Sequence, residues 1–204
     1  MQVHILNQLK ISLDKDDDLG KILKSKDFYF QKAQDALIKF QELPLSKDEE
    51  SFLFNHKKDY QKLRYEFETN SKYKEVGNLI FEIISYCDYH ARDKDKLNQY
   101  DDNRTLAKAY VRMHSWVEHL ISFKLDKQSI SSVSVDNAIR YLLDPINNFT
   151  ILSENHRKQI CKVLQKPYDP TKFNEYLVDY FNAIDIPVKH PYNKNWSSHC
   201  FVIK

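Results

Sequence analysis

Apolar residues recur at helical spacing along most of the chain. Within 104–124 they follow one another at steps of four, three, four and three residues, namely Leu106, Tyr110, Met113, Val117 and Leu120. This spacing places them on one face and is typical of an amphipathic helix. The same kind of spacing, with capping residues and prolines, predicts helices at 19–43, 46–69, 73–91, 135–143, 154–166 and 170–184.

Some predicted helices carry finer information. Ser46 and Glu49 have the pattern of a capping box, so a helix should begin at residue 46. The helix at 73–91 is apolar over more than half of its circumference and should be deeply buried. Residues 1–13 fit a strand or a short helix. We expect the core to include Ile80, Ile84, Met113, Val117 and Leu120.

A serine-rich, aperiodic segment at 126–134, DKQSISSVS, is the expected domain boundary. Beyond it, three short helices precede a tail with β-like pieces around HPYNKN. The sequence therefore predicts a mostly α fold. A helical bundle would occupy residues 1–126, and a smaller three-helix module would occupy 134–204 and end in a short C-terminal β-hairpin or an extended tail.

Composition narrows the function. Gly20 and Gly77 are the only glycines, where a typical chain has about 7%. Phosphate-binding loops and dinucleotide-binding fingerprints need several closely spaced glycines, so this sequence contains neither motif. The net charge of +2, from 31 basic and 29 acidic residues, is not the signature of a dedicated nucleic-acid-binding domain. We expect no cofactor.

Cysteine usage and hydropathy indicate a cytoplasmic protein. Cys87, Cys161 and Cys200 are odd in number and widely spaced, which favours reduced thiols over a disulfide framework. The N-terminus has no basic region followed by a long apolar run, so we expect no signal peptide. No stretch approaches about 18 uninterrupted apolar residues, so we expect no membrane contact.

Arg112 and His119 are separated by six residues in the helix predicted at 104–124. This Arg-x6-His spacing resembles the signature of the HEPN-type ribonucleases, and the resemblance implies RNA cleavage by these two side chains. Seven helical steps place them within about 20° around the axis but about 10.5 Å apart along it, so a compact site would need a second chain or a helix break. The main prediction therefore assigns no catalytic residue, and a HEPN-like ribonuclease is the alternative.

Four residues are potential zinc ligands by type. Cys87 and His90 lie on one predicted helix, and His114 and His119 lie on the next. His114 and His119 diverge by about 140° around their helix, so we predict no metal site.

The C-terminal third also allows a winged-helix-like nucleic-acid-binding module, as a third alternative, with 170–184 as the recognition helix. That helix carries Glu175 and Asp179 against Lys172, which is a poor surface for phosphates.

The tail combines aromatic and basic residues between prolines. Tyr and Trp are favoured at interfaces, and such rings also stack on bases. We therefore predict a non-enzymatic helical interaction or adaptor protein, or a subunit of a larger assembly. A protein partner is expected first and nucleic acid second, while the oligomeric state is left open. The predicted binding residues are Lys189, His190, Tyr192, Lys194 and Trp196.

Overall fold

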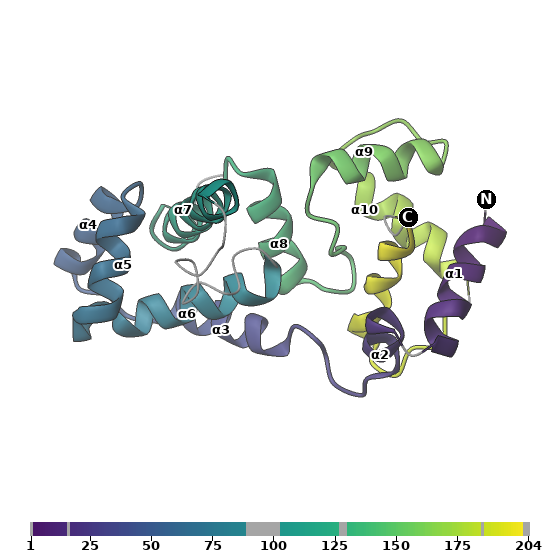
Figure 1. Ribbon diagram of the computed structural model, residues 1–204, viewed down its shortest axis with the longest axis horizontal. Coiled ribbons are helices and arrows are strands. Elements are labelled where there is room, and N and C mark those ends of the chain that lie inside the picture. The colour runs from purple at the N-terminus through teal and green to yellow at the C-terminus, as the bar shows by residue number, and fades with distance from the viewer. Residues whose placement is uncertain (1, 16, 89–102, 127–129, 185, 202–204) are drawn as a thin grey trace. The chain divides into compact units, whose positions relative to one another are not determined.

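The computed structural model describes residues 2–15, 17–88, 103–126, 130–184 and 186–201. Within these ranges the chain is helical and contains no strand, which confirms the mostly α fold. No helix in the same ranges combines the length and apolar character needed to cross a lipid bilayer. The elements are α1 (Gln2–Lys15), α2 (Asp18–Lys24), α3 (Gln31–Glu42), α4 (Lys47–His56), α5 (Tyr60–Thr69), α6 (Ser71–Cys87), α7 (Asn103–Leu125), α8 (Val133–Leu143), α9 (Glu154–Val163), α10 (Phe173–Asn182) and the 3-10 helix η2 (Pro191–Phe201) (Figure 1).

Contacts divide the chain into two compact units. The central unit spans Phe30–Val135, and the terminal unit combines Met1–Tyr29 with Asp136–Lys204. The boundary expected at 126–134 lies beside the junction at residue 135. Residues 1–29, expected to belong to the first bundle, instead group with the C-terminal residues. Helical spacing shows which face of a segment is apolar, but it does not show which distant element covers that face.

In the central unit, α6 packs against both α3 and α5, while α7 contacts α4, α5 and α6 (Figure 1). Burial of the apolar faces of α6 and α7 stabilises this bundle. The predicted core is confirmed, because the following side chains are all fully buried: Ile80, Ile84, Met113, Val117 and Leu120.

The segment predicted as a single helix at 46–69 is two helices. The predicted capping box is present at its start, since Glu49 accepts from the backbone N–H of Ser46 at 2.7 Å and Ser46 Oγ accepts from that of Glu49 at 3.4 Å. The first helix ends at His56. The second begins after Asp59, whose carboxylate accepts from the backbone N–H of Lys62 at 3.1 Å. An aspartate at the N-cap accepts a hydrogen bond from a backbone N–H in the first turn of a helix, so Asp59 favours the start of a new helix here.

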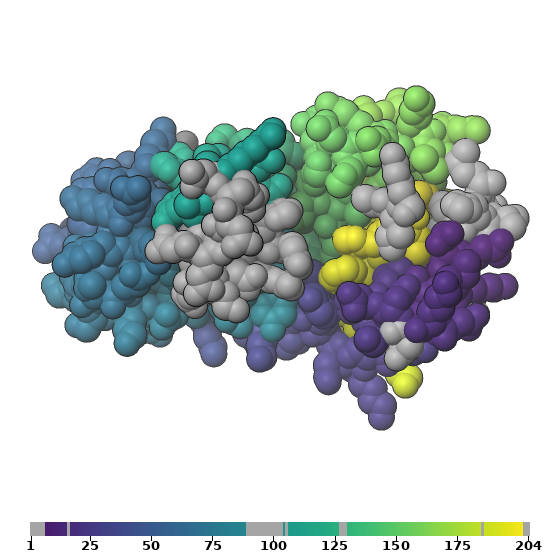
Figure 2. Space-filling view, in the orientation of Figure 1, coloured from purple at the N-terminus to yellow at the C-terminus, as the bar shows by residue number. Residues whose placement is uncertain are grey.

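In the terminal unit, α1 and α2 pack against each other and against η2. In Figure 2, atoms of η2 (yellow) are bordered by those of the N-terminal residues (purple) and by green residues of the same unit. The common core is formed by Leu9, Leu19, Leu23, Phe149, Ile151, Ile160, Cys161, Phe173, Leu177, Phe181, Ile186 and Cys200. Apolar residues from both ends of the chain therefore share one core.

The predicted C-terminal β-hairpin is wrong, because η2 occupies this part of the tail. Asn193 is fully buried, and its Nδ2 donates to the carbonyls of Ile22 at 3.0 Å and Asp27 at 2.9 Å. Its Oδ1 accepts from the backbone N–H of Tyr29 at 3.1 Å. A hairpin would pair backbone with backbone, whereas this tail is held by a side-chain amide bonded to distant backbone groups.

Asn195 repeats the arrangement two residues later. Its Nδ2 lies 2.7, 2.9 and 2.6 Å from the carbonyl oxygens of Pro145, Ile146 and Asn148. Its side chain is buried, so these carbonyls have a donor where water is largely excluded. We name Asn193 and Asn195 the asparagine clamp.

Both glycines mark close approaches between helices rather than turns. A Cβ at Gly77 of α6 would lie 2.6 Å from the Cβ and 2.7 Å from the Cγ of Phe67 on α5. A Cβ at Gly20 of α2 would overlap the backbone carbonyl of Ser12 on α1. Neither glycine has positive φ. Each unit therefore uses its glycine to bring two helices into contact.

Candidate functional site

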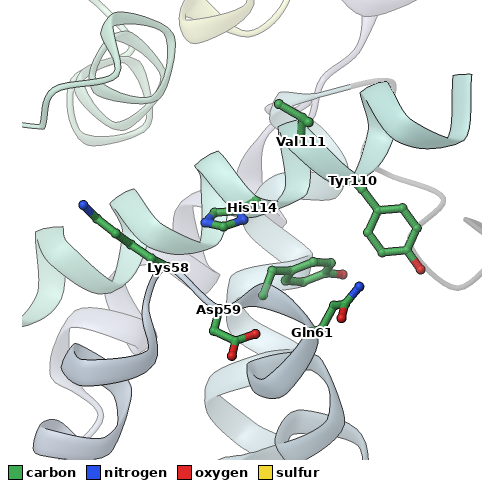
Figure 3. Close-up of a pocket in the computed structure, with 7 residues that line it drawn as sticks. Lys58, Asp59, Gln61, Tyr110, Val111 and His114 are labelled. Carbon is green, nitrogen blue, oxygen red and sulfur yellow. The ribbon is translucent and has the colours of Figure 1, made fainter. Parts of the chain in front are cut away.

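A pocket of about 500 Å³ lies in the central unit, where the turn between α4 and α5 faces α7. Figure 3 shows its lining side chains coming from that turn, from the start of α5 and from α7. We name it the α5–α7 pocket. It is lined by Lys58, Asp59, Tyr60, Gln61, Tyr110, Val111 and His114.

Local bonds fix the turn that forms one wall. Asp59 caps α5, so its carboxylate is held by the backbone N–H of Lys62. Lys58 Nζ lies 3.8 Å from Glu118 Oε1 on α7, although the Lys58 side chain is 77% exposed. A surface ion pair of this kind contributes little stability, but it links the turn to α7.

Two tyrosines form the inner wall. Tyr60 is buried, and its ring lies 6.2 Å from that of Tyr110 in an edge-on arrangement. Arg64 donates to Tyr110 Oη at 3.3 Å and pairs with Glu68 at 2.8 Å. The hydrogen bond to Glu68 raises the pKa of the Arg64 guanidinium. Arg64 and Tyr110 therefore already have hydrogen-bond partners within the protein.

The polar groups at the mouth differ from those of the wall. His114 on α7 is half-buried, Gln61 on α5 is exposed, and neither side chain hydrogen-bonds to a residue that the structure describes. Val111, one turn before His114, is 70% exposed. The pocket therefore presents an imidazole, an amide and an apolar side chain to an incoming group.

His56, the other histidine near this turn, has a hydrogen-bond partner at each ring nitrogen. His56 Nδ1 donates to the carbonyl of Phe52 at 2.8 Å, and its Nε2 accepts from Lys62 Nζ at 2.7 Å. Its ring also packs against Phe52, with 4.5 Å between ring centroids. His56 thus links α4 to α5, whereas neither ring nitrogen of His114 hydrogen-bonds to a described residue.

Arg112 and His119, the alternative catalytic pair, lie on α7 as predicted but have separate partners. Arg112 pairs with Asp88 at 2.9 Å, and Trp116 Nε1 donates to the same carboxylate at 3.0 Å. Arg112 therefore helps to hold the end of α6, where Asp88 is the C-cap residue.

His119 uses both ring nitrogens. Nδ1 donates to the carbonyl of Ser115 at 2.6 Å, and Nε2 accepts from Ser131 Oγ at 2.8 Å. The structure does not bring Arg112 and His119 to a common partner. The ribonuclease alternative stays a prediction that these contacts do not favour.

Three of the four potential zinc ligands, Cys87, His114 and His119, lie in the described ranges. Within the described ranges, no group of three or more His, Cys, Asp and Glu side chains could hold a metal ion. His90 lies outside those ranges. Cys87 ends α6, and burial raises the pKa of its thiol to about 12.

The aromatic members of the predicted tail site pack within the terminal unit. The His190 ring stacks on Phe28 at 5.8 Å, and Tyr192 meets Phe28 edge-on at 5.3 Å. Trp196 meets Tyr29 edge-on at 5.2 Å and stacks on His199 at 4.5 Å. These rings therefore hold η2 against the segment that follows α2.

The two lysines of the predicted tail site are less enclosed. Lys189 is exposed, and its backbone N–H donates to the carbonyl of Leu23 at 3.1 Å. Lys194 Nζ donates to Asn182 Oδ1 at 3.2 Å. The binding role of the five tail residues stays a prediction, but their aromatic rings are used for packing.

Comparisons with known proteins found no matching family model, no matching curated protein and no matching solved structure. Function is therefore inferred from the geometry of the α5–α7 pocket. Sequence reasoning missed this pocket, because it predicted a continuous helix across residues 57–59. Asp59, an N-cap residue between two apolar runs, was the signal that could have revealed the turn.

Proposed function

We propose that this chain is a non-enzymatic interaction protein that binds a partner protein through the α5–α7 pocket. The observation that carries the proposal is a pair of polar side chains in the pocket lining, His114 and Gln61, that hydrogen-bond to no described residue and accompany the exposed Val111. An imidazole and an amide that hydrogen-bond to no described residue can bond to a partner's backbone or side chains. The exposed valine, one turn before His114 on α7, offers apolar area for the same contact.

The surface near the pocket carries a further exposed side chain that suits a protein contact, Tyr65. Tyr65 follows Gln61 by four residues on α5, so the two lie on neighbouring positions of one helix face. Tyr65 is 65% exposed. Protein interfaces are enriched in tyrosine, and their binding energy is concentrated in a few such anchors surrounded by polar groups. A pocket with an exposed rim suits a side chain inserted by a protein partner better than an enclosed small molecule.

Site-specific photo-cross-linking tests this function. A photoreactive phenylalanine analogue replaces Val111 in the full chain, and the matched control carries it at Ile38, an exposed apolar position on α3 of the same unit. We expect position 111, but not position 38, to give a discrete adduct with another polypeptide in extract of the source cells. His114→Ala in the same chain should remove that adduct.

Three results would contradict the proposal. One is an adduct of equal yield from both positions, which would indicate nonspecific capture. Another is an adduct from position 111 that contains only nucleic acid. The third is an adduct from position 111 that survives both His114→Ala and Gln61→Ala.

A further inference from the structure

We infer that the partner segment is acidic and lies along the N-terminal half of α7 with an apolar side chain in the α5–α7 pocket. This inference rests on the proposed function, since it specifies what the pocket binds. Its basis is the charge on the exposed side of α7. Between Asn103 and Leu125 the helix contains a single acidic residue, Glu118.

Arg104 and Lys108 lie one turn apart on that helix, and both are exposed. Neither forms an ion pair with a residue that the structure describes. Arg112, one turn further on, is already paired with Asp88. Two cations are therefore left without a carboxylate from the described part of the chain.

These cations lie beside the pocket. Three steps of 100° put Lys108 about 60° from Val111 around α7, and seven steps put Arg104 about 20° from it. The axial separations are about 4.5 Å and 10.5 Å at 1.5 Å per residue. An extended segment with a residue length of about 3.4 Å can place an apolar side chain near Val111 and carboxylates near both cations.

Other charges near the pocket favour a polypeptide over nucleic acid. Asp59 lines the pocket, and Glu118 lies beside Lys58, so a phosphate backbone would meet two carboxylates. Phosphate binding requires several cations along its path. Tyr60 at the inner wall is almost fully buried, so a base could not stack on its ring. An acidic peptide can alternate carboxylates with neutral residues and avoid Asp59.

Selection from a random peptide display library on the full, immobilised chain tests the inference. We expect the selected peptides to be enriched in Asp and Glu around an apolar residue. In anisotropy titrations with a fluorescein-labelled selected peptide, Arg104→Glu with Lys108→Glu should weaken Kd about tenfold, because two attractions become repulsions. The matched control, Lys32→Glu with Lys39→Glu on α3, reverses two exposed charges of the same unit and should leave Kd unchanged.

The outcomes separate the inference from the proposed function. Selected peptides whose binding needs His114 but that are neutral or basic, or that bind the Arg104→Glu, Lys108→Glu variant as tightly, would overturn the acidic partner alone. Failure to select any peptide that depends on Val111 or His114 would overturn the proposed function itself. A labelled oligouridylate that displaces the selected peptide and binds more tightly than it would overturn the protein partner in favour of RNA.

Discussion

The tail of the terminal unit and the pocket of the central unit are built from similar residues but use them differently. Both combine histidine, tyrosine and an amide side chain with nearby lysines. In the tail, the asparagine clamp and the ring of Trp196 are bonded or packed inside the unit. In the pocket, His114 and Gln61 have no hydrogen-bond partner among the described residues.

This difference teaches that residue type alone does not reveal a binding surface. A polar group that the fold already satisfies has little to gain from a partner, because each new bond would replace an existing one. A group that is left toward solvent at a concave site exchanges a hydrogen bond to water, so it can bond to a partner without breaking a bond within the protein. Substitutions in the two regions should therefore differ in their effect on stability.

Loss of the asparagine clamp should have the largest effect. Asn195→Ala removes the donor shared by three carbonyls, and we expect the free energy of unfolding to fall by about 3 to 4 kcal/mol. Urea denaturation followed by circular dichroism measures this change. Lys194→Ala, between the two asparagines, is the control and should cost less than about 0.5 kcal/mol. Equal losses in the two variants would show that the clamp is not the stabilising contact.

Acid should weaken the terminal unit through His199. Burial lowers the pKa of His199 from the ordinary 6.5 to about 4, and its Nε2 lies 2.8 Å from Thr150 Oγ1. The unfolded chain therefore takes up a proton at a higher pH than the folded chain does. The stability from neutral His199 is fully present above about pH 6.5 and is lost as the pH falls to about 4.

The expected loss from this group is about 2 to 3 kcal/mol, because each tenfold change in proton affinity corresponds to about 1.36 kcal/mol. Denaturant melts between pH 7 and pH 4 measure it, with His199→Gln compared against His156→Gln. His156 is an exposed histidine of the same unit, and its charge is a smaller cause of the lowered pKa of His199 than burial is. His199→Gln should flatten the pH dependence of the unfolding free energy. If only His156→Gln flattened it, His199 would not be the group responsible for the loss.

Gly77→Ala should have a smaller effect whose sign is informative. Alanine in place of glycine inside a helix normally adds about 1 kcal/mol of stability. Here the new Cβ would meet Phe67 at 2.6 Å, and overpacking typically costs about 1 to 3 kcal/mol. We expect a net loss of about 1 kcal/mol in thermal or denaturant melts. Asn78→Ala, exposed on the same helix, should be neutral or slightly stabilising, and a stabilised Gly77→Ala variant would refute the close contact between α5 and α6.

The smallest change in stability should come from the pocket. His114→Ala removes no hydrogen bond to a described residue, so the free energy of unfolding should change by less than about 0.5 kcal/mol. His119→Ala on the same helix loses two bonds and should cost about 1 kcal/mol. Denaturant melts of both variants give this comparison. A larger loss for His114→Ala would mean that its ring has a structural partner.

The ribonuclease alternative is checked with the same proteins. A fluorescently labelled RNA incubated with wild type, Arg112→Ala and His119→Ala should remain intact in every case, because Arg112 and His119 serve different contacts. Cleavage by the wild type that both substitutions abolish, with the fold preserved, would establish catalysis and contradict a non-enzymatic protein.

Much of the fold could be predicted from local spacing. The apolar steps around Met113 and Val117 predicted the helix and its buried face, and the capping box at Ser46 and Glu49 predicted a helix start. These features depend on residues within a few positions of one another. Local physical chemistry is therefore sufficient to predict them.

The parts that could not be predicted depend on distant partners. Asn193 bonds to Ile22 and Asp27, more than 160 residues away, so no local pattern distinguishes η2 from a hairpin. The grouping of α1 and α2 with the C-terminal residues has the same origin. The pocket escaped prediction because apolar spacing continues through the turn that Asp59 ends. Only the helix-capping character of that aspartate indicated the break.

One paired measurement tests most directly whether the pocket binds and the tail supports the fold. Val111→Asp and Trp196→Ala are compared by melting temperature and by recovery, per folded molecule, of the polypeptide that cross-links to position 111. We predict that Val111→Asp keeps the melting temperature within about 1 °C and loses the partner, because Val111 is 70% exposed. Trp196→Ala should lower the melting temperature by about 5 °C or more and keep the partner. Loss of the partner in Trp196→Ala at unchanged stability, with normal recovery in Val111→Asp, would contradict the account.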